Sequence, residues 1–310
     1  MQNNSLQQII IDKSKELGFN LIGFSPAKGI NTKINQWVDL GFHASMKWMK
    51  TSLEQRRNIL EYFPEAKTVI SFGYNYYTDN NRNNNDYKIS NYAWGNDYHV
   101  VLKEKLYEII KIINLHKQQF NYRVCVDTSP IMEKHWGQKS GLGWIGKHTN
   151  LINSKIGTWF FLSEIIIDFE MNYNKPFTYD LCGTCTKCID ACPTEALDDY
   201  ILDSNKCISY LTIEHRDSIP DSSSEKLNNW IYGCDICQEV CPWNIKYEQI
   251  SSDNNFKKRN KIDIKNDEDW ENISVEEYQK TFKKSPIKRT KYSGITRNIL
   301  INKENKNIES

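Results

Sequence analysis

The chain has 310 residues, and its 40 Lys and Arg against 39 Asp and Glu leave a net charge of +1, which excludes a uniformly polycationic nucleic-acid binder. Its length is typical of two domains. No stretch reaches the ~18 apolar residues that a membrane span needs, and 1–12 lacks the charged and apolar regions of a signal peptide. We therefore expect a cytoplasmic, monomeric protein without a membrane partner.

Helices and strands alternate in the first part of the chain. Apolar residues at helical spacing predict helices over 5–17, 98–120 and 132–140. Apolar runs between turn residues predict strands over 21–24, 68–74 and 123–127, and a hairpin over 150–167 that turns at 153–157. This order favours an α/β (α+β) catalytic domain over 1–175.

Two segments of this domain are candidates for binding. The segment 79–97 is polar and longer than a connection between two elements usually is. Tyr92, Trp94 and Tyr98 at its end indicate a binding loop. The glycine-rich segment 141–147 follows a predicted helix rather than a strand, so it differs from a nucleotide-binding loop. We interpret it as a tight turn that permits close approach of a flat group.

Eight of the nine cysteines form two runs in the second half of the chain. The first run has the spacing C-x2-C-x2-C-x3-C-P of bacterial ferredoxins, and the second has C-x2-C-x3-C-P with one more cysteine upstream. In two-cluster ferredoxins the cysteine before the proline ligates the other cluster. We therefore predict a ferredoxin-like domain over 176–250 with two 4Fe-4S clusters. The predicted ligands are Cys182, Cys185, Cys188 and Cys241 for cluster 1, and Cys192, Cys207, Cys234 and Cys237 for cluster 2.

Two alternatives to this interpretation concern zinc and a simpler function. C-x2-C pairs also bind structural zinc, but zinc pairs are not normally followed by a third cysteine at this spacing and a Cys-Pro ending. Clusters of this type transfer single electrons, so the domain over 1–175 is expected to hold an acceptor that carries out organic chemistry. A ferredoxin-type electron carrier is the alternative function, and it would leave that domain without a role.

The C-terminal segment 251–310 changes charge along its length. Residues 251–266 are charged and predict a linker with few anchors. From 281 to 303 the chain has basic residues and no acid, with aromatic residues between them, which is most often a solvated face and is also a candidate nucleic-acid contact. We expect Arg297 and Asn298 at the start of an apolar helix over 299–301, where backbone amides favour a phosphate. The candidates are Lys288, Arg289, Arg297 and Asn298.

Four motifs around the cysteine runs carry a specific resemblance. They are Val126-Asp-Thr-Ser-Pro130, Gly141-Leu-Gly-Trp-Ile-Gly-Lys-His148, Tyr92-Ala-Trp-Gly-Asn-Asp-Tyr-His99 and Arg297-Asn298. Together with the eight cysteines, these motifs resemble the epoxyqueuosine reductase family from the N-terminal helix to about residue 300. Many members carry helical repeats after this point, and no C-terminal helical repeats are expected here.

The resemblance implies a cobalamin-dependent enzyme with two 4Fe-4S clusters. Such an enzyme removes the epoxide oxygen of epoxyqueuosine at the wobble position of tRNA, in the last step of queuosine biosynthesis. The implied partners are a tRNA with a GUN anticodon, bound in part by the basic segment, and an external low-potential electron donor. A reductive dehalogenase-like enzyme is the alternative with the same cofactors, and the twin-arginine export signal common in that class is absent from the sequence.

The resemblance also implies site residues. Asp127 corresponds to the proton donor, which requires desolvation or neighbouring groups to raise its pKa, although its sequence context alone also fits a turn at the end of a strand. Cob(I/II)alamin is expected base-off, because the Asp-x-His-x-x-Gly signature of histidine ligation lacks its glycine after His99, and His99 is expected to orient a neighbour or cap a helix. Cys125 is expected to be a small buried residue. The implied cobalamin contacts are Arg56, Ser90, Asp127, Lys134, Lys147, Leu151, Ser209, Tyr210 and Thr212.

Overall fold

A four-stranded sheet is the framework of the N-terminal domain. The structure, a computed structural model, describes residues 5–78, 86–259, 262 and 265–309. The sheet has the order β1-β2-β7-β4, and each neighbouring pair is antiparallel, so the domain is of the α+β form of the predicted class. The strands are β1 Leu21–Pro26, β2 Thr68–Asn75, β4 Tyr122–Cys125 and β7 Phe160–Ile167.

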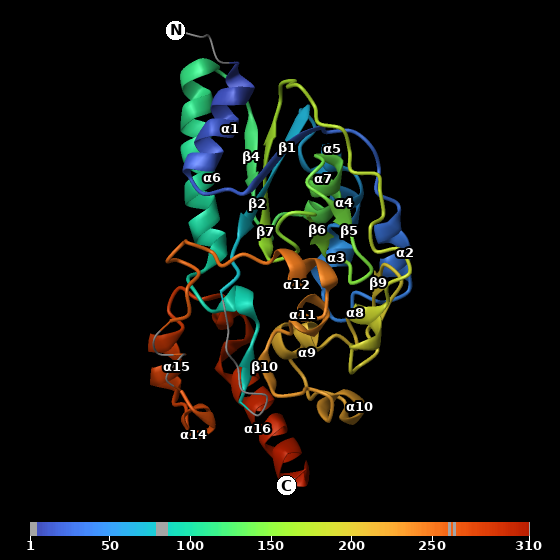
Figure 1. Cartoon of the computed structure of the whole chain (residues 1–310), viewed down its shortest axis with the longest axis vertical. Coiled ribbons are helices and arrows are strands. Elements are labelled where there is room, and N and C mark those ends of the chain that lie inside the picture. The colour runs from blue at the N-terminus through green and yellow to red at the C-terminus, as the bar shows by residue number, and fades with distance from the viewer. Residues whose placement is uncertain (1–4, 79–85, 260–261, 263–264, 310) are drawn as a thin grey trace.

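Helices cover both faces of this sheet (Figure 1). On one face α1 (Leu6–Glu16) and α6 (Tyr98–His116) bury their apolar stripes against alternate residues of the strands. Because β7 lies between two strands and is covered on both faces, its sequence is an almost unbroken apolar run. The helices on the other face are α2 Lys33–Asp39, α3 Lys47–Thr51, α4 Leu53–Arg57, α5 Ile59–Tyr62 and α7 Glu133–Lys139.

The hairpin predicted over 150–167 is wrong in its pairing. The chain turns where expected, with an isolated bridge between Asn153 and Gly157. However, β6 (Leu151–Ile152) pairs with β5 (Trp144–Ile145), whereas β7 pairs with β2 and β4. Strand alternation gives the faces of a strand but not the identity of its partner, so the sequence pattern could not distinguish these pairings.

The glycine-rich turn over 141–147 allows close approach within the domain. A Cβ at Gly143 would lie 1.9 Å from the carbonyl oxygen of Ile152, so only glycine lets β5 and β6 meet here. A Cβ at Gly141, whose φ is +77°, would lie 2.7 Å from the carbonyl oxygen of Lys175. These two glycines therefore accommodate the protein's own backbone rather than an external flat group.

The cysteines lie in a module of short elements between the two ends of the molecule. Its helices are α8 Lys187–Asp190, α9 Ile208–Ile213, α10 Asp221–Ser224, α11 Ile236–Glu239 and α12 Pro242–Tyr247. Its strands are β8 Leu197–Asp198, β9 Ile201–Leu202 and β10 Trp230–Tyr232. β10 pairs in parallel with β3 (Lys88–Ile89) of the preceding domain.

Two buried side chains of this module hold it against the N-terminal domain. Asn244 accepts a hydrogen bond from the backbone N–H of Thr158 at 2.6 Å and donates one to the Thr158 hydroxyl at 2.8 Å. Asp235 accepts hydrogen bonds from the Ser90 hydroxyl and, at 2.7 Å, from the backbone N–H of Asn91. Because Asp235 lies between two cysteines in sequence, the cysteine turn itself is fixed to the neighbouring domain.

The prediction of a linker with few anchors over 251–266 is wrong for its described part. Phe256 is buried in the core beneath α6, and the Asp253 carboxylate accepts a hydrogen bond from the Tyr74 hydroxyl at 2.6 Å. The Arg259 guanidinium donates to several backbone carbonyl oxygens of other segments. Charged composition suggested solvent exposure, but these charged groups are satisfied internally.

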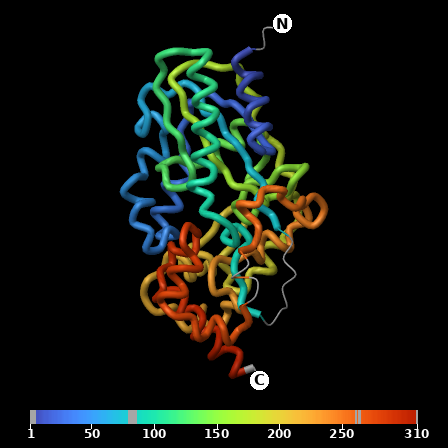
Figure 2. The backbone as a smooth tube through the Cα atoms, turned by 90° about the vertical axis from the view of Figure 1, so that its left-hand side faces the viewer, coloured from blue at the N-terminus to red at the C-terminus, as the bar shows by residue number. Residues whose placement is uncertain are grey.

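The C-terminal elements form a second core at the end of the molecule opposite the N-terminus (Figures 1 and 2). They pack around β3 and β10, and Trp94 of the predicted binding loop is buried there, donating its indole N–H to the carbonyl of Ile89 at 2.9 Å. Residues 79–85 of that loop lie outside the described residues. The elements of this part are η1 Asn91–Ala93, α14 Asp267–Glu271, α15 Val275–Thr281, η2 Pro286–Thr290 and α16 Lys291–Glu309.

The helix expected over 299–301 begins earlier than predicted. Because α16 starts at Lys291, Arg297 and Asn298 lie within the helix, and its N-terminal amides are not next to them. The Asn298 amide is fully buried and donates to the carbonyls of Thr212 and Ile231, both at 2.9 Å.

Among the helices that the structure describes, none is long and apolar enough to cross a membrane.

The first prediction concerns Asn298. We expect Asn298→Ala to lower the free energy of unfolding by about 1–3 kcal/mol, because it leaves the Ile231 carbonyl without its side-chain donor, whereas the Thr212 carbonyl keeps the Thr290 hydroxyl as a donor. Leu300→Ala on the same helix is the control: this side chain is 58% exposed, and surface changes cost within about 0.5 kcal/mol. Anaerobic denaturant titration of the cluster-loaded protein measures both. Equal unfolding midpoints for the two variants would contradict the structural role of Asn298.

Candidate active site and cluster sites

Asp127 lies directly after β4, where the chain turns sharply. Its φ is +57°, a left-handed conformation that is uncommon outside glycine. Its backbone N–H donates a hydrogen bond of 2.6 Å to the Glu133 carboxylate at the start of α7. The same Asp127 carboxylate oxygen accepts hydrogen bonds from the Tyr98 hydroxyl and from Nε2 of His99, both at 3.0 Å. Asp127 is therefore held in place both through its backbone N–H and through its carboxylate.

His99 bridges two carboxylates at the start of α6. Its Nδ1 lies 2.7 Å from the Asp97 carboxylate, while its Nε2 faces Asp127. Asp97 also caps the helix by accepting the backbone N–H of His99. Desolvation acts to lower the pKa of His99, but the contacts with Asp127 and Asp97 outweigh it and raise that pKa to about 9. At neutral pH the imidazole therefore carries a proton on each nitrogen.

The electrostatics of Asp127 differ from the sequence-based expectation. Desolvation acts to raise its pKa, but hydrogen bonds from His99 and Tyr98 and the charge of Arg289 outweigh it, so the pKa lies below the usual value. The expectation that the surroundings raise the pKa of Asp127 is therefore wrong for this state. The proton lies on His99, one hydrogen bond away from the Asp127 carboxylate.

The Asp127 carboxylate is accessible although protein surrounds it on several sides. Its side chain is 56% exposed. Its charge nevertheless shifts the pKa values of groups in several other segments, among them Arg56, Lys134 and Arg289. An exposed group that is also partly desolvated is typical of the wall of a recess. The Asp127 turn therefore presents a carboxylate to an incoming ligand within protein surroundings.

Of the implied cobalamin contacts, Arg56 and Lys134 lie in this neighbourhood. Arg56 is half-buried and donates to the Ile131 carbonyl at 3.3 Å, and the Lys134 amine donates to the Asn150 side chain at 3.0 Å. Desolvation is the largest influence on both and lowers their pKa values. Both cations are therefore near Asp127.

The other implied contacts are mostly internal. Ser90 binds Asp235, the Lys147 amine pairs with Asp199 at 3.1 Å, and Leu151 belongs to a small apolar cluster. The Tyr210 hydroxyl lies 2.6 Å from that of Ser45, and the Thr212 hydroxyl is fully buried between backbone groups. Ser209 is half-buried, and its backbone N–H faces the sulfur of Cys207. The nine implied contacts are thus divided between the Asp127 neighbourhood and positions away from it, and Lys147 lines the same cavity as Cys182.

The cysteine side chains fall into two groups. One group lines a cavity of about 300 Å³ beside α12. Its members are Cys182, Cys185, Cys188 and Cys241. Cys241 arrives in this group from the second run, as the sequence-based crossover requires, and its sulfur faces the backbone N–H groups of Trp243 and Asn244. A cavity of this size with converging thiols fits a cubane cluster, and the Trp144 indole N–H at 3.5 Å from the Cys182 sulfur provides a hydrogen bond to it.

The second group lies closer to Asp127. The thiols of Cys192, Cys207, Cys234 and Cys237 lie near one another, because their charges shift pKa values within this group. Burial is the largest influence on Cys207, Cys234 and Cys237 and raises their pKa values, so a bound metal has to stabilise their thiolates. Lys134 feels the charges of both Cys207 and Cys237 as well as that of Asp127. Lys134 is therefore near both this group and the Asp127 carboxylate.

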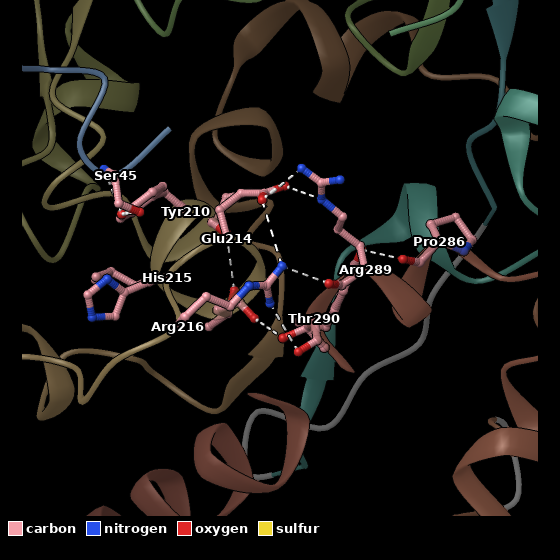
Figure 3. A network of polar contacts seen from close by, with 12 residues as sticks. Ser45, Tyr210, Glu214, His215, Arg216, Pro286, Arg289 and Thr290 are labelled. Atoms are coloured by element: carbon pink, nitrogen blue, oxygen red, sulfur yellow. Dashed lines mark hydrogen bonds and ion pairs between the residues drawn. The ribbon is translucent and has the colours of Figure 1, made fainter. Parts of the chain in front are cut away.

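Four residues were predicted as nucleic-acid contacts. Among the described residues, Arg289 is the only one of these four whose charge lowers the pKa of Asp127. Its guanidinium donates two hydrogen bonds to the Glu214 carboxylate, at 2.8 Å and 3.0 Å (Figure 3). It also lies over the ring of Trp48 at 5.3 Å. Since Trp48 is 40% exposed, these two residues from distant segments form a basic and aromatic surface beside the Asp127 neighbourhood.

The other predicted contacts differ in orientation. Lys288 is exposed next to Arg289. Arg297 instead donates to the carbonyls of Leu211, His215 and Asp217, and Asn298 is buried as described above. The structure therefore brings Lys288 and Arg289 to the surface and places Arg297 and Asn298 inside.

Sequence reasoning missed the two acidic residues behind Asp127. Glu133 holds the Asp127 turn, and Glu164 is a fully buried carboxyl group in the middle of β7. A signal for Glu164 was available, because it is the one charged residue in the otherwise mostly apolar run Phe160–Ile167. For Glu133 no local signal exists, because glutamate is common in the first turn of a helix.

Comparisons with known proteins match both parts of the chain. Residues 56–128 match the family described as Epoxyqueuosine reductase QueG, DUF1730, and residues 181–244 match the 4Fe-4S double cluster binding domain. The chain is 42% identical to the epoxyqueuosine reductase of Leadbetterella byssophila, over 93% of this chain and 95% of that protein. It is 41% identical to the epoxyqueuosine reductase of Cyclobacterium marinum, over 94% and 95% of the two chains.

Solved structures agree with these matches. A crystal structure of an epoxyqueuosine reductase with an epoxyqueuosine-modified tRNA-Tyr stem loop has a TM-score of 0.86 and 26% identity, covering 96% of this chain and 80% of that one. The Bacillus subtilis enzyme, in a structure whose catalytic aspartate loop is swung out of the active site, has a TM-score of 0.84 and 25% identity over the same shares of the two chains, 96% and 80%. The chain therefore belongs to the epoxyqueuosine reductase family of oxidoreductases, and it carries that family's double 4Fe-4S cluster domain.

Proposed function

We propose that this chain reduces epoxyqueuosine at the wobble position of GUN-anticodon tRNAs to queuosine, with Asp127 as the group that protonates the departing oxygen. The observation that carries this proposal is the accessible Asp127 carboxylate, hydrogen-bonded to a protonated His99. A family member with a bound epoxyqueuosine-modified tRNA stem loop supports the substrate class. The sequence matches to epoxyqueuosine reductases along most of the chain support the reaction.

We propose cobalamin as the group that occupies the Asp127 neighbourhood. When bound, it supplies a strongly reducing cobalt centre next to the substrate. Arg56 and Lys134 fit its phosphate and amide groups, because both are cations that lie beside Asp127 and are not neutralised by an ion pair within 4 Å among the described residues. Both nitrogens of His99 are engaged by carboxylates, so His99 would orient Asp127 rather than bind the cobalt of a cobalamin held here.

The two thiol groups support an order of electron transfer. Cluster 1 is assigned to Cys182, Cys185, Cys188 and Cys241, and cluster 2 to Cys192, Cys207, Cys234 and Cys237. The thiols assigned to cluster 2 are near Lys134 and Asp127, while those assigned to cluster 1 line the cavity to which Trp243 and Tyr247 also belong. An external low-potential donor would therefore reduce cluster 1 first, and cluster 2 would pass electrons toward the substrate site.

The proton chemistry follows from the balance of the reaction. Removal of an epoxide oxygen as water breaks two C–O bonds, forms a C=C bond and consumes two electrons and two protons. His99 holds one proton at neutral pH, and Asp127 can pass it to the oxygen because one carboxylate oxygen faces His99 while the side chain remains accessible. Tyr98 fixes the carboxylate orientation through its hydroxyl.

Lys288 and Arg289 are proposed tRNA phosphate contacts. Both are exposed, and Arg289 is oriented by Glu214 toward Trp48 and Asp127. The inward orientation of Arg297 and Asn298 supports an indirect role, in which they anchor the helix that follows Lys288 and Arg289. This arrangement places positive charge where an anticodon stem loop would approach the Asp127 carboxylate.

The second prediction tests the reaction and its acid. Wild-type protein with reduced clusters, cobalamin and epoxyqueuosine-modified tRNA should yield a wobble nucleoside lighter by one oxygen atom, measured by mass spectrometry. Asp127→Asn keeps the shape of the side chain but removes its ionisable group, so we expect turnover to fall about 100- to 10,000-fold. Iron and cobalamin content are the controls. Turnover within a few-fold of wild type would remove Asp127 from the mechanism.

The third prediction concerns the basic surface. We expect Lys288→Gln with Arg289→Gln to weaken tRNA binding and to reduce the log-log salt slope by up to ~0.9 for each lost phosphate contact. Lys15→Gln with Lys111→Gln is the matched control, because it removes the same charge from exposed positions on α1 and α6 at the other end of the molecule. If both double variants bind tRNA with the same affinity and salt slope, the segment is a solvated face.

A further inference from the structure

Glu164 is a charged residue type in a position that normally holds an aliphatic side chain. It lies in the middle of β7, opposite Ser71 on β2 and Cys125 on β4. It is fully buried, and neither of its carboxyl oxygens has a hydrogen-bond partner among the described residues. An ionised carboxylate without a partner is strongly disfavoured in such surroundings, so Glu164 keeps its proton.

Glu133 connects this buried group to the active-site turn. It begins α7, which packs on β7, and one oxygen of its carboxyl group accepts a hydrogen bond from the backbone N–H of Asp127 at 2.6 Å. Desolvation, followed by the charge of Asp127, raises the pKa of Glu133 to about 8, and desolvation and Glu133 together raise the pKa of Glu164 well above its usual value. At neutral pH both carboxyl groups are therefore predominantly protonated.

The reaction needs one proton more than the Asp127 and His99 pair holds. This inference rests on the proposed function, in which loss of the epoxide oxygen as water consumes two protons. We propose that Glu133, backed by Glu164, stores the second proton and returns it to the Asp127 carboxylate after the first transfer. In this sequence the first proton converts the opened epoxide oxygen to a hydroxyl, and the second lets that oxygen leave as water. The two electrons come from the external donor through the clusters.

Groups from several elements surround this carboxyl pair. The neighbouring cations lower the cost of ionising Glu133, whereas the Asp127 charge and burial oppose it. Cys125 is fully buried next to the pair, and burial raises the pKa of its thiol to about 12, so it remains neutral. The titratable groups that face the pair are Arg56 from α4, Tyr98 and His99 from α6, Cys125 from β4, Asp127 from the turn and Lys134 from α7, and Tyr62 from α5 faces Cys125.

The geometry distinguishes proton storage from simple positioning. Glu133→Gln keeps a side-chain oxygen that can accept the Asp127 N–H but removes the proton. Glu164→Gln likewise preserves the volume and neutrality of the protonated acid. A purely structural role would therefore survive both substitutions, whereas a role in proton supply would not.

The test is a single turnover of the cluster-loaded, cobalamin-loaded and pre-reduced enzyme. The enzyme is mixed with epoxyqueuosine-modified tRNA stem loop at pH 7 in weak buffer with an indicator dye, and queuosine formation is followed in parallel. For the wild type we expect product to form before protons are taken up from solution. For Glu133→Gln we expect uptake of one proton together with product formation and a rate at least about tenfold lower. Glu164→Gln should change uptake in the same direction.

The control is Glu170→Gln, because Glu170 is exposed just beyond β7. It should match the wild type in rate and proton uptake. Unchanged uptake and rate in both Glu133→Gln and Glu164→Gln, with normal iron and cobalamin content, would overturn proton storage while leaving the proposed reaction intact. If the wild-type enzyme forms no queuosine, the proposed function fails, and this inference fails with it.

Discussion

The rest of the structure depends on the rigid attachment of the cysteine module to the catalytic domain. Asn244 provides one part of it, because its side chain serves the backbone and hydroxyl of Thr158, and a Cβ at Gly157 would lie 2.1 Å from its oxygen. Asp235 provides the other part through Ser90 and Asn91. Electron transfer between fixed centres requires such rigidity, and buried, fully satisfied polar contacts supply it with a defined geometry. A loose module would separate the cysteines near Lys134 from the Asp127 turn.

Neighbouring residues fix both the left-handed backbone of Asp127 and the orientation of its charged, accessible carboxylate. Its left-handed backbone is held by Glu133, and its carboxylate is held by Tyr98 and His99. Because His99 is itself held by Asp97, the proton resides on a base that cannot turn away. In the proposed mechanism Asp127 passes a proton from His99 to the substrate oxygen, so its own pKa does not have to be raised.

What could be predicted from the sequence was mainly local. Cysteine spacing is set by the turn around a cluster, so it indicated both groups of thiols before the fold was known. Helix α6 and strand β2 were placed to within a few residues by their apolar periodicity. Strand partners, the anchoring of Asp253 and the orientation of Arg297 were not predictable, because each depends on segments distant in sequence. A run of basic residues gives charge, but it does not say which side chains face carbonyls inside the protein.

The central claim is that His99 holds a proton that Asp127 delivers, and the pH dependence of a single turnover tests it most directly. Since the pKa of His99 is raised to about 9 and the protonated form is the active one, the rate should be highest at lower pH and be lost as the pH rises through that value. The fall should begin nearer pH 8, where Glu133 also loses its proton. In His99→Asn the rate should be lower, and the part of the fall near pH 9 should disappear. A wild-type rate that stays constant from pH 7 to about 10, or an unchanged profile in His99→Asn, would contradict the account.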